Sequence, residues 1–218
     1  INTWSVVGPF DSSVSKLQKT LKNGESLTRR FSSNAVEGSV QFRPVEQLLF
    51  NGMVPVGDYM YPTDGKVAYL RTFIHADEPR NAQVRLKTSR PVALWLNGQR
   101  SPELEPFPQS VLDNAVADVQ LQEGWNRLVV RTRGADYWPV GARITSRDGE
   151  SLHESLRFDR KIHTSSVGFP DETVQLELRR KQVNLDEIGS DARRQFWRSR
   201  LAGWIGPDSI ENDEMTAF

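Results

Sequence analysis

Apolar and polar residues alternate along several short stretches of the chain. In residues 82–87 every second side chain is apolar, which predicts a strand with one buried face and one solvated face. The same period of two recurs in residues 117–121, 128–132 and 174–178. Further candidate strands are residues 4–7, 40–42, 67–74, 92–96, 142–145 and 156–158. Many short strands at such intervals predict an all-β fold, an antiparallel β-sandwich.

Dipeptides that favour tight turns lie between the candidate strands. They are Asn51-Gly52, Asp64-Gly65, Asn97-Gly98 and Asp148-Gly149. Asparagine, aspartate and glycine tolerate the positive φ angles of tight turns at low energetic cost. The turn chemistry and the strand period therefore predict the same architecture.

Two stretches depart from the strand pattern and predict helices. The first is residues 14–21, and the second begins at Leu185 and ends at Ile205, with apolar side chains at helical spacing. Phe196 and Trp204 make the second helix too apolar to remain in water. We expect this helix to dock either on the sandwich or on a neighbouring chain or domain.

The predicted elements divide the chain into two parts. Residues 1–155 are expected to form the sandwich domain. Residues 156–218 are expected to form a C-terminal extension with one or two strands, the α-helix of residues 185–205 and an acidic tail. Because the chain begins at Ile1 rather than Met, we expect it to be processed or excised from something longer.

Charge and composition narrow the classes of partner. The 218 residues include 28 basic and 28 acidic side chains, so no net charge attracts nucleic acid or anionic lipid. The absence of cysteine excludes disulfides and thiolate metal sites. No apolar run approaches the roughly 20 residues that cross a bilayer, so we expect no membrane span.

Five segments, in order along the chain, resemble the signature of a known family. They are WSVVGPF at 4–10, AYLRT at 68–72, VALWLNG at 92–98, LQEGWNRLVV at 121–130, and WPVGAR at 138–143 with Asp148-Gly149. The pattern resembles galactose-binding-like jelly rolls, which occur as sugar-binding domains of family 2 glycoside hydrolases and as accessory modules of large exported bacterial proteins. The resemblance covers roughly residues 1–150. It implies a jelly-roll fold, a secreted or periplasmic location and a non-catalytic role.

Aromatic and arginine side chains supply the chemistry of a sugar site. Pyranose rings stack their C–H faces on tyrosine or tryptophan, while planar donors such as arginine bind hydroxyl and carboxylate oxygens. In the modules that the chain resembles, loops at one rim hold the sugar. The candidate ligand-binding residues are Tyr59, Tyr61, Arg71, Trp95, Tyr137, Trp138 and Arg143.

Each candidate also has a structural alternative. The two arginines could pair with the carboxylate of an acidic sugar or with a surface aspartate or glutamate. The loop aromatics could instead cap the ends of the sandwich or meet a neighbouring domain. Trp95 is exposed only if its face of the strand is open. Core packing is expected for Trp4 and Trp125.

Neither a metal site nor a catalytic centre is expected. Asp58, Asp64, Asp118 and Asp136 are candidates for a structural Ca²⁺, but they lack the dense spacing of a dedicated calcium loop. The three histidines are widely scattered. The sequence holds no zinc-protease motif, nucleophile elbow or phosphate-binding glycine loop.

Three functional hypotheses remain, and we rank them in order. The first is a non-catalytic carbohydrate-binding module of a larger polysaccharide-processing protein, with a polysaccharide or oligosaccharide as ligand. The second is a structural module that docks on other domains or subunits through the helix of residues 185–205. The third is a glycoside hydrolase or lyase with an unrecognised active site.

Overall fold

The chain folds into two antiparallel β-sheets that pack as a sandwich, as the alternating pattern predicts. The computed structural model describes residues 1–11, 31–32, 37–49, 52–105, 113–134, 138–161 and 176–180. The larger sheet has seven strands. In spatial order they are β4 (Arg43–Pro44), β1 (Ser5–Phe10), β6 (Val67–Ala76), β11 (Gly124–Arg133), β8 (Val92–Leu96) and β9 (Gln99–Arg100), and β13 (Arg157–Asp159) also pairs with β6.

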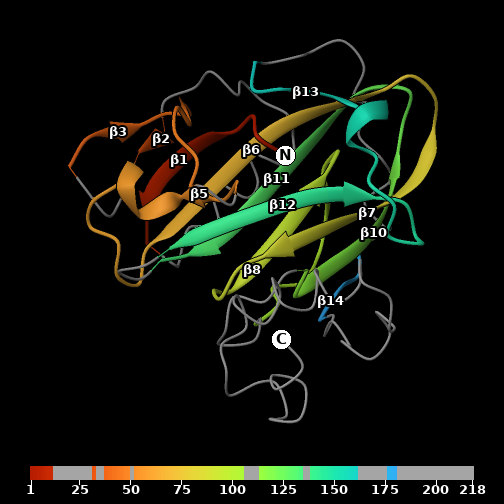
Figure 1. Ribbon diagram of the computed structural model, residues 1–218. Coiled ribbons are helices and arrows are strands. Elements are labelled where there is room, and N and C mark those ends of the chain that lie inside the picture. The colour runs from red at the N-terminus through yellow and green to blue at the C-terminus, as the bar shows by residue number, and fades with distance from the viewer. Residues whose placement is uncertain are drawn as a thin grey trace, which may run out of the picture.

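The smaller sheet has five strands and lies against the larger one. In spatial order they are β14 (Leu178–Arg180), β10 (Ala115–Leu121), β7 (Arg80–Lys87), β12 (Pro139–Thr145) and β5 (Val54–Pro55). A separate pair is formed by β2 (Phe31–Ser32) and β3 (Ser39–Val40). Figure 1 shows the two layers, with β12 crossing in front of β6 and β11.

The main hydrophobic core lies between the two sheets. Leu70 and Leu94 reach it from the larger sheet, and Val84 and Leu86 reach it from the smaller one. Each strand contributes alternate residues because successive side chains of a strand point to opposite faces. Trp4 belongs to the same core and is 1% exposed, so its predicted packing role is confirmed.

The outer face of β7 corrects one expectation. The alternating pattern predicts that Gln83, Arg85 and Lys87 are solvated, but all three are buried, with exposed fractions of 6%, 6% and 9%. Arg85 does not need water as a partner, because its guanidinium donates hydrogen bonds to the side chains of Thr145, Asp113 and Gln83. Alternation therefore marks the strand correctly but does not show that polar partners bury its second face.

The second face of the seven-stranded sheet is also buried. It carries a smaller apolar cluster that includes Phe10, Tyr69, Phe73 and Trp95. The Tyr69 and Trp95 rings meet in a tilted arrangement with centroids 6.1 Å apart. Trp95 is 3% exposed, so this face of the strand is not open.

Asn97 and Asn126, from the segments at 92–98 and 121–130, connect two neighbouring loops. Asn97 has a φ of 52°, which suits the turn after β8. Its amide nitrogen donates to Oδ1 of Asn126 at 2.8 Å, and its own Oδ1 accepts from the backbone N–H of Arg127 at 2.8 Å. The side chains thus tie the β8–β9 turn to the start of β11.

Strands from beyond residue 155 add to both sheets. β13 pairs with β6, and β14 pairs with β10. The predicted strand at 174–178 overlaps β14 only at Leu178, while the predicted helices at 14–21 and 185–205 lie outside the described residues. In the part of the chain that the structure describes, no helix is long and apolar enough to cross a membrane.

Candidate functional site

A pocket opens at one end of the sandwich and contains two of the predicted tyrosines. It is lined by residues 8–9, 39–41, 43 and 57–61, and we call it the rim pocket. Its volume of about 790 Å³ lies in the range of roughly 300–1,000 Å³ that is usual for small-molecule sites. β1, β3, β4 and the short 3₁₀ helix η1 (Val56–Tyr59) bring its residues together.

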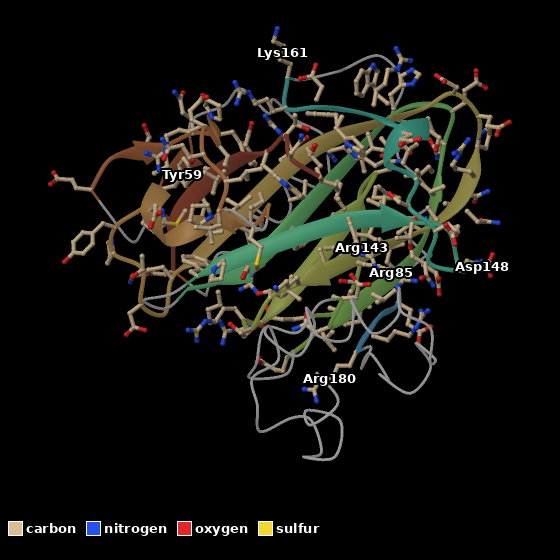
Figure 2. The ribbon with its side chains drawn as sticks, in the orientation of Figure 1. Tyr59, Arg85, Arg143, Asp148, Lys161 and Arg180 are labelled. Carbon is tan, nitrogen blue, oxygen red and sulfur yellow. The ribbon has the colours of Figure 1, made fainter. Side chains whose placement is uncertain are left out.

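Tyr59 forms a fixed wall of the rim pocket. Its hydroxyl accepts hydrogen bonds from the backbone N–H groups of Glu46 and Gln47, both at 3.0 Å, and donates to the Gln47 carbonyl at 3.2 Å. The Arg43 guanidinium donates to the backbone carbonyl of Tyr59. These bonds occupy the hydroxyl, so Tyr59 offers the pocket its ring rather than its polar end. Figure 2 shows Tyr59 at the end of the molecule opposite Asp148.

Tyr61 presents its ring to solvent at the mouth of the rim pocket. It is 87% exposed, and it is the one exposed large hydrophobic side chain among the residues the structure describes. Gln41, Arg43 and Asp58, which are all exposed, line the same pocket. The pocket therefore combines an open aromatic face with amide, guanidinium and carboxylate groups.

Trp138 lies inside the core rather than at the rim. It is 2% exposed, and its indole N–H donates to Oγ1 of Thr132 at 3.0 Å. Gly134 makes room for the ring, because a Cβ at that position would lie 2.4 Å from Cζ3 of Trp138. The indole is consequently taken up by packing in the core. The neighbouring candidate Tyr137 lies outside the described residues.

Arg71 and Trp95 lie together on the buried second face of the larger sheet. The Arg71 guanidinium sits 4.1 Å from the ring centroid of Phe42, and Arg100 sits 5.3 Å from that of Trp95. Burial, and then the positive charge of Arg127, lowers the pKa of Arg71 to about 10. Arg71 is 3% exposed, and its guanidinium lies over the rings of Phe42 and Phe73.

Arg143 lies apart from the other candidates, on the outer face of β12. It forms an ion pair with Asp113, with Nε donating to Oδ1 at 2.8 Å. Burial alone would raise the pKa of Asp113, but hydrogen bonds and charges from Arg143 and Arg85 hold it below its ordinary value. The hydrogen bond to Asp113 outweighs burial and raises the pKa of Arg143.

Sequence reasoning finds part of the rim pocket. It identifies Tyr59 and Tyr61, which the fold brings to one pocket with several polar residues. It misses Gln41, which lies in the predicted strand at 40–42, and Arg43, because the pairing of the two-residue strand β4 with the distant β1 leaves no periodic signal. The structure holds no group of three or more histidine, aspartate or glutamate side chains fit for a metal ion within its described residues.

Comparison with known proteins gives no family assignment. No protein-family model matches the chain. No curated protein matches it significantly either.

Proposed function

We propose that this chain is a non-catalytic carbohydrate-binding module that holds a polysaccharide or oligosaccharide in the rim pocket. The fold proposed for it is a galactose-binding-like jelly roll. We further propose that it serves a larger secreted or periplasmic protein that processes polysaccharides. The observation that carries the proposal is the open ring of Tyr61 beside the polar side chains of the rim pocket.

The chemistry of the pocket suits a sugar ring. The apolar C–H face of a pyranose can stack on Tyr61, and such ring contacts are worth on the order of 1 kcal/mol in addition to the buried area. Arg43, Gln41 and Asp58 supply the planar donors and acceptors that hydroxyl pairs require. A ring fixed in place, as Tyr59 is, loses little side-chain entropy when a ligand binds.

A binding screen followed by one side-chain removal tests the proposal. The protein is first run in affinity gels that contain soluble polysaccharides and is applied to a glycan array. The best ligand is then titrated by calorimetry into wild type, Tyr61→Ala and Tyr61→Phe. We expect Tyr61→Ala to weaken binding about tenfold, because the stacking surface is lost. Tyr61→Phe keeps the ring and should bind within about twofold of wild type.

Two outcomes would contradict the proposal. If the protein binds none of the glycans, a spacer or docking role becomes the better explanation of the fold. If a glycan binds and Tyr61→Ala retains full affinity, the sugar site lies elsewhere than the rim pocket.

A further inference from the structure

A second pocket lies on the outer face of the five-stranded sheet, beside β12. It is lined by residues 1–2, 52–53, 85, 87, 113, 141–144, 151, 153 and 158, and we call it the outer-face pocket. Its volume is about 450 Å³. It shares no lining residue with the rim pocket, so each pocket can be tested separately.

Positive charge predominates in the outer-face pocket. Arg85 and Lys87 come from β7, Arg143 comes from β12, and Asp113 is the one carboxylate among the described lining residues. Arg143 lies directly opposite Arg85 in the ladder between the two strands. Figure 2 shows these two arginines next to each other over the sheet. Arg85 and Arg143 share the single carboxylate of Asp113, so this pair carries one positive charge in excess and the pocket favours an anion.

The hydrogen bonds show that Arg85 is fully used within the protein, whereas Arg143 can still donate to a ligand. Arg85 is 6% exposed, and each of its three nitrogens donates to a neighbouring side chain. Arg143 binds Asp113 through Nε and Nη2, while its Nη1 has no hydrogen-bond partner among the described residues. Its side chain is 42% exposed. Arg143 can therefore donate to a ligand without giving up Asp113.

An apolar wall completes the outer-face pocket. Met53 and Phe158 line it together with the charged groups. Gly141 permits Met53 to approach, because a Cβ at that position would lie 3.1 Å from Cγ of Met53. Lys87 is 9% exposed, and burial lowers its pKa to about 8. The ammonium group remains mainly protonated at neutral pH, so it adds positive charge to the pocket.

We propose that the outer-face pocket binds the carboxylate of an acidic sugar, with Arg143 and Lys87 on the carboxylate and the apolar wall against the ring. The planar guanidinium suits a carboxylate because it can donate two parallel hydrogen bonds. The mixture of apolar wall and cations distinguishes this pocket from an exposed patch that attracts any small anion.

Paired ligands test the charge requirement. Short oligogalacturonates and oligoglucuronates are titrated by calorimetry at about pH 7, each beside its fully methyl-esterified form, which keeps the sugar and removes the charge. We expect the acid form of at least one pair to bind at least tenfold more tightly than its ester. Inorganic sulfate and phosphate serve as separate titrations, and we expect both to bind more weakly than the acidic sugar.

Paired variants test the location. Arg143→Gln and Lys87→Met should each weaken binding of the acidic sugar about tenfold. Arg179→Gln is the matched control, because Arg179 also has a 42% exposed side chain that is paired with an aspartate but lies outside the pocket. It should bind within about twofold of wild type. Tyr61→Ala should leave this affinity unchanged, which separates the outer-face pocket from the rim pocket.

Several results would overturn the inference. The carboxylate site would be ruled out if neither acidic oligosaccharide binds, or if acid and ester bind with equal affinity. It would also be ruled out if Arg179→Gln loses as much affinity as Arg143→Gln. Sulfate or phosphate binding as tightly as the sugar would show a plain anion site and overturn the sugar assignment. If Arg143→Gln fails to fold, the affinity measured with Lys87→Met decides the location, because methionine has nearly the length of lysine and lacks only its charge.

Discussion

Asn126 shows how one side chain can satisfy the backbone of a whole loop. Its amide nitrogen donates to the carbonyls of Gln122 at 2.8 Å and Gly124 at 3.1 Å, and its Oδ1 accepts from the Gln122 N–H at 2.8 Å. Asn126 is fully buried. Buried backbone groups need such partners because water cannot reach them.

Replacing Asn126 with alanine should lower the free energy of unfolding by about 3 kcal/mol, because several buried polar groups lose their partner at once. Urea unfolding followed by fluorescence measures the change. Asn81→Ala is the control, since Asn81 is exposed on β7 and its loss should change stability by less than about 0.5 kcal/mol. A small loss in Asn126→Ala would mean that the loop finds other hydrogen bonds.

Some residues of the candidate site could be predicted from the sequence, and others could not. Tyr59 and Tyr61 are near neighbours in a turn-rich segment. They can therefore be predicted to line the same pocket without knowing the order of the strands. The burial of Trp138 depends on the small residue Gly134 beneath it, and that of Trp95 depends on cover over the second sheet face. Neither the packing at Gly134 nor the cover over the sheet face produces a pattern in the local sequence.

Among the elements, β7 and β12 are joined by a partly buried ion-pair network. Asp113 accepts hydrogen bonds from Arg85 of β7 at 3.1 Å and from Arg143 of β12 at 2.8 Å. The Asp113 side chain is 5% exposed. Its carboxylate therefore holds together two arginines that face each other across the ladder.

Asp113→Asn should lower the free energy of unfolding by about 2 kcal/mol at neutral pH, because it leaves partly buried arginines without a counter-charge. The folded pKa of Asp113 lies below its ordinary value of 3.8, so this stabilisation is present above that value. It is lost as the pH falls through the folded pKa. Urea unfolding at several pH values should show the gap between wild type and variant closing in acid.

The control for this measurement is Asp148→Asn, in the turn that follows β12. Asp148 is exposed, so its neutralisation should change stability little at any pH. A constant gap for Asp113→Asn down to acid pH would show that packing, rather than charge, accounts for its effect.

Strand positions were predictable because burial between two sheets imposes a period of two. The candidates at 67–74, 92–96 and 142–145 lie within β6, β8 and β12. The two-residue strands were not predictable, since β4, β5 and β9 are too short to display a period. β7 shows a further limit, because polar residues buried by ion pairs have the same pattern as solvated ones.

At the scale of the molecule, β14 completes the smaller sheet from a distant part of the chain. Leu176 and Leu178 enter the main core and are 6% and 8% exposed. Arg179 on the outer face pairs with Asp118 at 2.6 Å. This exposed pair contributes little stability, so the two leucines account for most of the attachment.

A chain that ends at Lys161 should therefore be less stable than one that ends at Arg180. Each buried leucine is worth roughly 1.5–3 kcal/mol, so for the two we expect a difference of at least about 3 kcal/mol in the free energy of unfolding. Urea unfolding of the two chains under the same conditions measures it. Leu178→Ala in the full chain provides the matched comparison and should lose about 2 kcal/mol. Equal stability of the two truncated chains would show that β14 is not attached in solution.

The short outermost strands of both sheets affect how copies of the molecule can associate at high concentration. β4, β5 and β9 have two residues each and β14 has three, and Pro44 and Pro55 have no N–H to offer a further strand. An incoming chain finds too few backbone groups to extend either sheet. Many molecules gathered on one surface should therefore remain separate particles instead of growing into fibrils.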